Sequence, residues 1–95
     1  MWITKVGTIG TIGSENGRII NDEENPHGAR ITLEQNGHTP FGITCGIYGL
    51  MCHTAFASEY EEAMFKFEEM KQDIERFFID DIDESNWCEQ FKDKY

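Results

Sequence analysis

The pattern of apolar and polar residues changes at Ser58. Residues 1–57 contain short stretches of alternating apolar and polar positions separated by glycines, and this period of two is typical of β-strands. After Ser58 the apolar residues recur every three or four positions, which is the period of an amphipathic helix. The sequence therefore predicts a single α+β domain over residues 1–95, with an antiparallel sheet in residues 1–57 and a helical part in residues 58–95.

The clearest predicted strand covers residues 29–35, where Ala29, Ile31 and Leu33 alternate with polar residues. Asn-Gly pairs at positions 16–17 and 36–37 are typical of hairpin turns. The other predicted strands are residues 2–12, 18–20, 41–47 and 50–57. Because short connections join them, we expect an antiparallel meander of about five strands.

The pairing of residues 41–47 with residues 50–57 decides which side chains share a face. A two-residue turn at Tyr48 and Gly49 would place Cys45 opposite Cys52 on an apolar face and His53 on the other face. A three-residue loop would shift the pairing by one residue and exchange the faces. The agreement of apolar positions favours the two-residue turn, and the face that the helix covers is left open.

The segment after Ser58 predicts one long helix packed on one face of the sheet. Ser58 and Glu61 match a capping box, which starts a helix. The long helix is expected to end near residues 78–81. A short C-terminal helix is predicted after it, because Trp87, Phe91 and Tyr95 are spaced four residues apart. The apolar stripe of the long helix consists of Tyr60, Ala63, Met64, Phe67, Met70, Ile74 and Phe78.

The charge of the chain limits its partners. The formal net charge is −10, and residues 58–95 hold five bases against thirteen acids, a balance of −8. Nucleic acids and anionic membrane surfaces attract clustered lysine and arginine, so this balance argues against both. No apolar run approaches the roughly 20 residues of a membrane span. With three cysteines and no signal-peptide pattern, a cytoplasmic protein is expected.

No motif with a catalytic spacing stands out. The predicted loop at residues 22–28 contains three acids and His27, but their spacing matches no recognised metal site. No serine or cysteine occupies a recognisable nucleophile motif. The sequence therefore favours a non-catalytic protein over an enzyme, and we expect no cofactor and no metal.

The leading hypothesis is a small interaction or regulatory module that self-associates as a homodimer. It rests on Phe65, which points away from the apolar stripe into the acidic face of the helix. Phe65 is either an isolated surface residue, a residue covered by the terminal aromatics, or the anchor for another chain. The candidate interface residues are Phe65, Glu69, Gln72 and Trp87.

Two alternative functions follow from other parts of the sequence. A small-molecule-binding domain or modest enzyme would use the sheet face around His53, with Thr44 and Tyr48 as further polar groups. An acidic inhibitor of a basic protein would use the negative charge of the helix to imitate phosphates.

Overall fold

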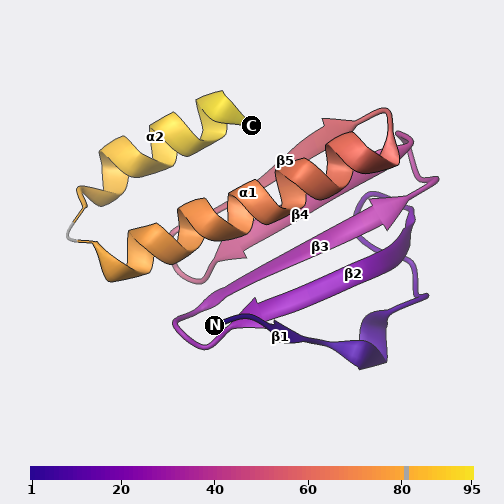
Figure 1. Ribbon diagram of the computed structural model, residues 1–95, viewed down its shortest axis with the longest axis horizontal. Coiled ribbons are helices and arrows are strands. Elements are labelled where there is room, and N and C mark those ends of the chain that lie inside the picture. The colour runs from indigo at the N-terminus through magenta and orange to yellow at the C-terminus, as the bar shows by residue number, and fades with distance from the viewer. Residues whose placement is uncertain (81) are drawn as a thin grey trace.

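The computed structural model describes residues 1–80 and 82–95 and contains a five-stranded antiparallel sheet with strand order β1-β2-β3-β4-β5. Two helices follow the sheet in the chain (Figure 1), so the predicted α+β meander with a long and a short helix is confirmed. The elements are β1 (Ile3–Thr4), a 3₁₀ turn η1 (Val6–Thr8), β2 (Arg18–Asn25), β3 (Ala29–Gln35), β4 (Phe41–Ile47), β5 (Met51–Ala57), α1 (Tyr60–Ile79) and α2 (Glu84–Lys94).

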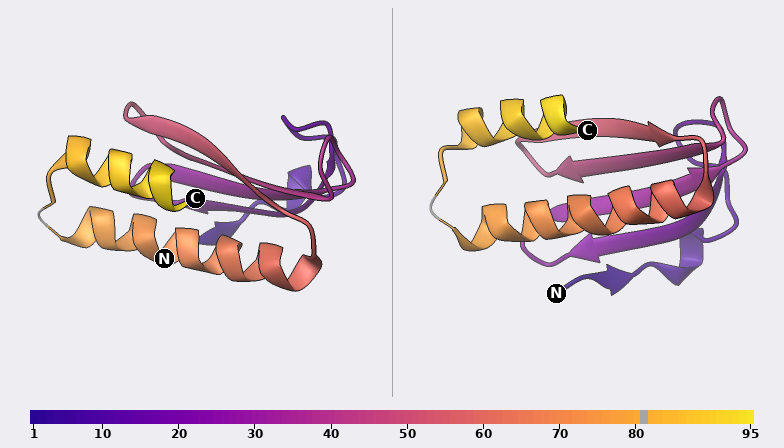
Figure 2. Two further views of the ribbon diagram at one scale, coloured as in Figure 1. Left: turned by 90° about the horizontal axis from the view of Figure 1, so that it is seen from above. Right: turned by 45° about the horizontal axis from the view of Figure 1, so that its top comes forward.

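Both helices lie on the same face of the sheet (Figure 2). The predicted stripe of α1 forms the core, because Ala63, Phe67 and Met70 are fully buried together with Ile74. They pack in one cluster with the apolar residues of β3 and β4. Tyr60 differs from the prediction, since it lies at the exposed margin of the stripe with its ring edge against Phe41.

The start of α1 differs from the predicted capping box. The helix begins at Tyr60, and Glu59 occupies the N-cap position without a side-chain hydrogen bond. The Ser58 backbone N–H instead donates to Glu62 Oε1 at 3.1 Å, one residue beyond the predicted partner Glu61. The helix ends at Ile79, within the predicted range of residues 78–81, of which residue 81 lies outside the described residues.

Strand β2 continues through residues 22–25, which the sequence predicted as part of a loop. These residues pair with both neighbours, for example Asp22 with Thr32 and Glu24 with Ile3. Polar residues are tolerated here because α1 supplies polar partners: Lys71 Nζ lies 2.8 Å from Glu23, and Asn25 hydrogen-bonds Glu75. The loop prediction for residues 22–25 is therefore wrong.

The β4–β5 hairpin has the register that the sequence analysis disfavoured. Three residues, Tyr48–Leu50, connect the strands, and Ile47 pairs with Met51. Gly49 adopts a φ of +78°, a conformation that glycine reaches without strain, whereas a two-residue turn would have imposed it on Tyr48 as well. As a result Cys45 pairs with His53 and Thr44 with Thr54, and the predicted Cys45–Cys52 pair does not form.

Candidate functional site

The sheet face away from the helices, here called the open face, contains a concave pocket of about 440 Å³. Strands β3, β4 and β5 form its floor, and the N-terminal segment, residues 5–17, forms one wall. A volume of this size falls in the range of small-molecule sites. The residues that line it are Thr8, Thr11, Ile12, Gly13, Ser14, Ile19, Arg30, Thr32, Thr44, Cys45, Gly46, Tyr48 and Cys52.

Two buried carboxylates fix the N-terminal segment on the sheet. Glu34, at 1% exposure, accepts hydrogen bonds from the backbone N–H groups of Glu15 at 3.1 Å and Gly17 at 3.0 Å. Asp22 is fully buried and accepts a hydrogen bond from the Thr8 hydroxyl at 2.5 Å. The N-terminal segment can lie this close to Glu34 because residue 13 is a glycine. A Cβ at that position would overlap the Glu34 carboxyl group.

Asp22 also orients the guanidinium of Arg30. Arg30 donates from Nε at 3.0 Å and from Nη2 at 2.6 Å, a bidentate geometry. Burial opposes ionisation of Asp22, but the hydrogen bonds from Arg30 and Thr8 and the charge of Arg30 outweigh it, so the pKa of Asp22 is lowered. The same hydrogen bond raises the pKa of Arg30. The pocket wall therefore presents a permanently charged group in one orientation.

The other polar side chains of the pocket are hydroxyls and the Cys52 thiol. The Thr44 and Thr54 hydroxyls lie 3.1 Å apart, and the Tyr48 hydroxyl donates to Glu24 at 2.8 Å. That hydrogen bond, together with partial burial, raises the pKa of Tyr48, so the phenol stays protonated and is a weaker acid than a free tyrosine. The pocket can donate and accept hydrogen bonds, but the residues that line it include no histidine or carboxylate to act as a general base.

The structure does not bring together the three residues of the predicted ligand face. Thr44 and Tyr48 line the pocket, whereas His53 lies on the opposite face under α2, with its ring 6.1 Å from that of Phe91. Its Nε2 is buried and has no hydrogen-bond partner among the described residues. The prediction that His53 shares a face with Thr44 is wrong, because the register of the hairpin is shifted by one residue.

The three cysteines are free and separate. Cys45 is buried toward the helices, and burial raises the pKa of its thiol to about 12, so it acts as a small apolar residue. Cys52 is exposed on the open face, and Cys88 lies on α2. Within residues 1–80 and 82–95, no three His, Cys, Asp or Glu side chains are grouped so as to hold a metal ion.

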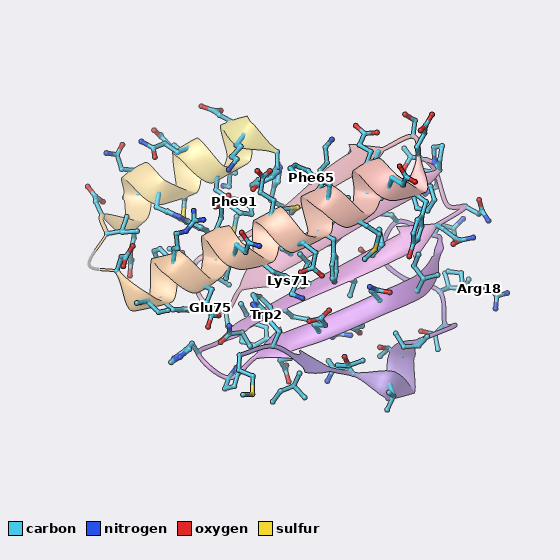
Figure 3. The ribbon with its side chains drawn as sticks, viewed as in Figure 1. Trp2, Arg18, Phe65, Lys71, Glu75 and Phe91 are labelled. Carbon is cyan, nitrogen blue, oxygen red and sulfur yellow. The ribbon has the colours of Figure 1, made fainter. Side chains whose placement is uncertain are left out.

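The outer surface of the helices is the second candidate site. Phe65 is 67% exposed on α1, and Figure 3 shows it past the C-terminal end of α2, whereas Phe91 lies between the helices. The terminal aromatics therefore do not cover Phe65. Its neighbours at helical spacing are Glu61, Glu62, Glu68 and Glu69, and Gln72 is exposed two turns further along.

Trp87 does not belong with the other predicted interface residues. Its ring packs 4.6 Å from that of Phe77 and 4.9 Å from that of Phe91, and Tyr95 continues the cluster beside Phe91. This cluster attaches α2 to the rest of the domain. Glu69 faces α2 as well, where Lys94 Nζ lies 3.8 Å from it. Phe65 and Gln72 are the members of the predicted set that stay on the free surface.

Sequence reasoning missed Asp22, Arg30 and Glu34. The sequence pattern predicts a loop at Asp22 and places Arg30 and Glu34 on the polar side of a strand. The available signal was the density of glycines in residues 7–17, which permits a chain to lie close to a sheet. That signal does not identify the carboxylates that hold the segment.

A scan against protein-family models and searches of curated proteins and of solved structures gave no significant match to this chain. Across the residues that the structure describes, no helix combines the length and apolar character needed to cross a bilayer. The functional argument therefore depends on the two candidate sites.

Proposed function

We propose that the protein is a non-catalytic binding module whose helical surface binds a basic protein partner, with Phe65 as the apolar anchor. The observation that carries this proposal is the exposure of Phe65, 67%, beside the exposed acids Glu61, Glu62 and Glu68. An exposed aromatic residue surrounded by charge is the arrangement of a binding hot spot with a polar rim.

The charges of the helical layer favour a basic partner. Three of its four lysines are already paired within the molecule, for example Lys71 with Glu23 at 2.8 Å and Lys94 with Asp73 at 2.9 Å, whereas Lys92 forms no ion pair with a described residue. Several exposed acids form no ion pair with a described residue, namely Glu59, Glu61, Asp80, Glu84, Glu89 and Asp93. The surface therefore keeps an excess of negative charge, which accelerates association with a basic protein and opposes approach of the same surface of a second copy.

Photo-crosslinking from position 65 tests this proposal. We expect p-benzoylphenylalanine at position 65, introduced in the native host, to give one discrete adduct with a basic protein. Because the carboxylates contribute through long-range attraction, the adduct should disappear near 1 M salt, where the screening length falls to about 3 Å.

Ile12 provides a matched control, since it is 65% exposed but lies on the open face. The same label at position 12 should not give this adduct. An adduct with the mass of two copies of the chain, an adduct common to both positions, or no adduct at position 65 would each contradict the proposal.

The open-face pocket supports a second candidate function, the binding of a small uncharged ligand rich in hydrogen-bonding groups. The observation in its favour is the Arg30 guanidinium on the pocket wall, which Asp22 orients and whose positive charge the Asp22 carboxylate balances. We expect polar fragments to bind in ligand-observed NMR and to lose binding in Thr44→Phe, which fills the pocket floor. A fragment set that binds neither protein, or both equally, would count against this function.

A further inference from the structure

The β4–β5 hairpin lies in an uncharged part of the chain. From Gln35 to Ser58 there is no Asp, Glu, Lys or Arg, although 27% of all residues are charged. This stretch includes both strands of the hairpin, β4 and β5, and β5 is one of the two edge strands of the sheet. A molecule with a net charge of −10 therefore has one region where another copy can approach without local repulsion.

The outer edge of β5 has backbone groups available for pairing. The Phe56 carbonyl accepts a hydrogen bond from Lys66 Nζ at 2.8 Å, so it points away from β4. In an antiparallel pair the residues alternate between the two sides, and the N–H and C=O of Cys52 and Thr54 therefore point outward too. Among the described residues, no strand pairs with this edge.

The two edges of the sheet differ in the way they are protected. Strand β1 has two residues, and a very short edge strand is one of the devices that prevent unwanted pairing. Strand β5 has seven residues, with no proline, no charged residue and no shift in its register with β4. Lys66 contacts one end of this edge and can be displaced, because it is a long side chain at the surface.

We propose that a second copy of the chain pairs with this edge, β5 against β5, antiparallel about a twofold axis at Thr54. Thr54 is the centre of Met51–Ala57, so this register overlaps the whole strand. Thr54 of each copy would face its equivalent, and Cys52 would face Phe56 of the other copy. Each of these outward residues then exchanges backbone hydrogen bonds, and the two sheets become continuous.

A second copy suits this edge better than a charged partner does. Apart from Lys66 at one end, the edge offers neither sign of charge to a basic or an acidic protein, whereas a twofold interface needs only a surface that complements itself. Phe56 is 46% exposed on the same hairpin and would become covered by the residue opposite it. Both helices lie on one face of the sheet (Figure 2), so the paired sheet would keep its helices on one side.

This inference is independent of the proposed function, because the β5 edge and Phe65 are different surfaces. The test is the mass of the protein in solution, by light scattering after size exclusion. At roughly 100 μM, where dimers with micromolar dissociation constants are populated, we expect twice the 11.0 kDa of the single chain.

Two substitutions at Thr54 should return the mass to that of one chain. Thr54→Pro removes an outward N–H, so it breaks no hydrogen bond to β4, and Thr54→Lys places two like charges directly opposite each other. Thr32→Lys, on the same open face but in the interior strand β3, should remain a dimer, and so should Phe65→Glu. Circular dichroism identifies the variants that fold. If Thr54→Pro does not fold, the mass of Thr54→Lys tests the β5–β5 pairing.

A single-chain mass for the folded wild-type protein would overturn the inference. A dimer that persists in folded Thr54→Lys would also overturn it, and dissociation by Phe65→Glu would assign the dimer to the helical surface instead. Hydrogen exchange adds a local measurement: the amides of Thr54 and Phe56 should exchange more slowly as the protein concentration rises, and exchange rates independent of concentration would contradict the pairing.

Discussion

Phe67→Ala is expected to lower the free energy of unfolding by about 3–5 kcal/mol, whereas Phe65→Ala should change it by no more than about 0.5 kcal/mol. The two residues have the same side chain and lie two positions apart on α1. Phe67 is fully buried in the core, so truncation leaves a cavity and removes buried apolar area, whereas Phe65 is 67% exposed. For a domain of this size, 3–5 kcal/mol is a large part of the total stability.

Urea unfolding monitored by circular dichroism measures both effects on the same scale. The pair also separates stability from binding, because Phe65→Ala should leave the folded protein intact while it weakens partner capture. Losses of similar size in the two variants would mean that α1 is rotated relative to the arrangement described above. An unchanged free energy of unfolding in Phe67→Ala would also mean that α1 is rotated.

Arg30→Ala is expected to lower the free energy of unfolding at pH 7 by about 3 kcal/mol, because removal of one partner leaves the other charge buried and unpaired. Asp22 is fully buried, and after the substitution the Thr8 hydroxyl is its remaining side-chain partner. The N-terminal segment should loosen as well, since Thr8 attaches it to the same carboxylate. Arg30→Lys should lose less stability, because it keeps a charge but not the bidentate geometry.

The difference between the wild-type protein and Arg30→Ala should shrink as the pH falls. In the wild-type protein the pKa of Asp22 is lowered, so its contribution is fully present above the ordinary carboxyl pKa near 4 and is lost as the pH falls through the lowered value. In the variant, burial without Arg30 should raise the pKa of Asp22. In acid this carboxyl group is protonated and no longer a buried unpaired charge, so the stability of Arg30→Ala approaches that of the wild-type protein.

Urea titrations at pH 7 and pH 3 test this sign, and the double variant Asp22→Asn, Arg30→Met is the control. Replacement of both partners removes the unpaired charge, so the double variant should be more stable at pH 7 than Arg30→Ala. A stability difference between the wild-type protein and Arg30→Ala that stays constant with pH would show that Asp22 is not the group responsible.

The sequence determined the elements that depend on local periodicity. The stripe of α1 and the alternation in β3 each contrast apolar with charged or polar residues, so they indicate both the type of element and its buried side. Phe65 was recognised as an exposed residue for the same reason, since its position departs from a regular helical stripe. These features can be predicted from the sequence because they depend only on residues that are near one another along the chain.

Only the tertiary structure decided the register of the β4–β5 hairpin and the contacts that depend on it. Residues 41–57 contain no charged side chain, so their two faces differ too little in polarity for the pattern to distinguish them. The choice depended on Gly49, which accepts the positive φ that the three-residue loop requires. The positions of His53 and Cys52, and the pairing of Asp22 with Arg30, followed from contacts between segments distant in sequence, which a local pattern does not encode.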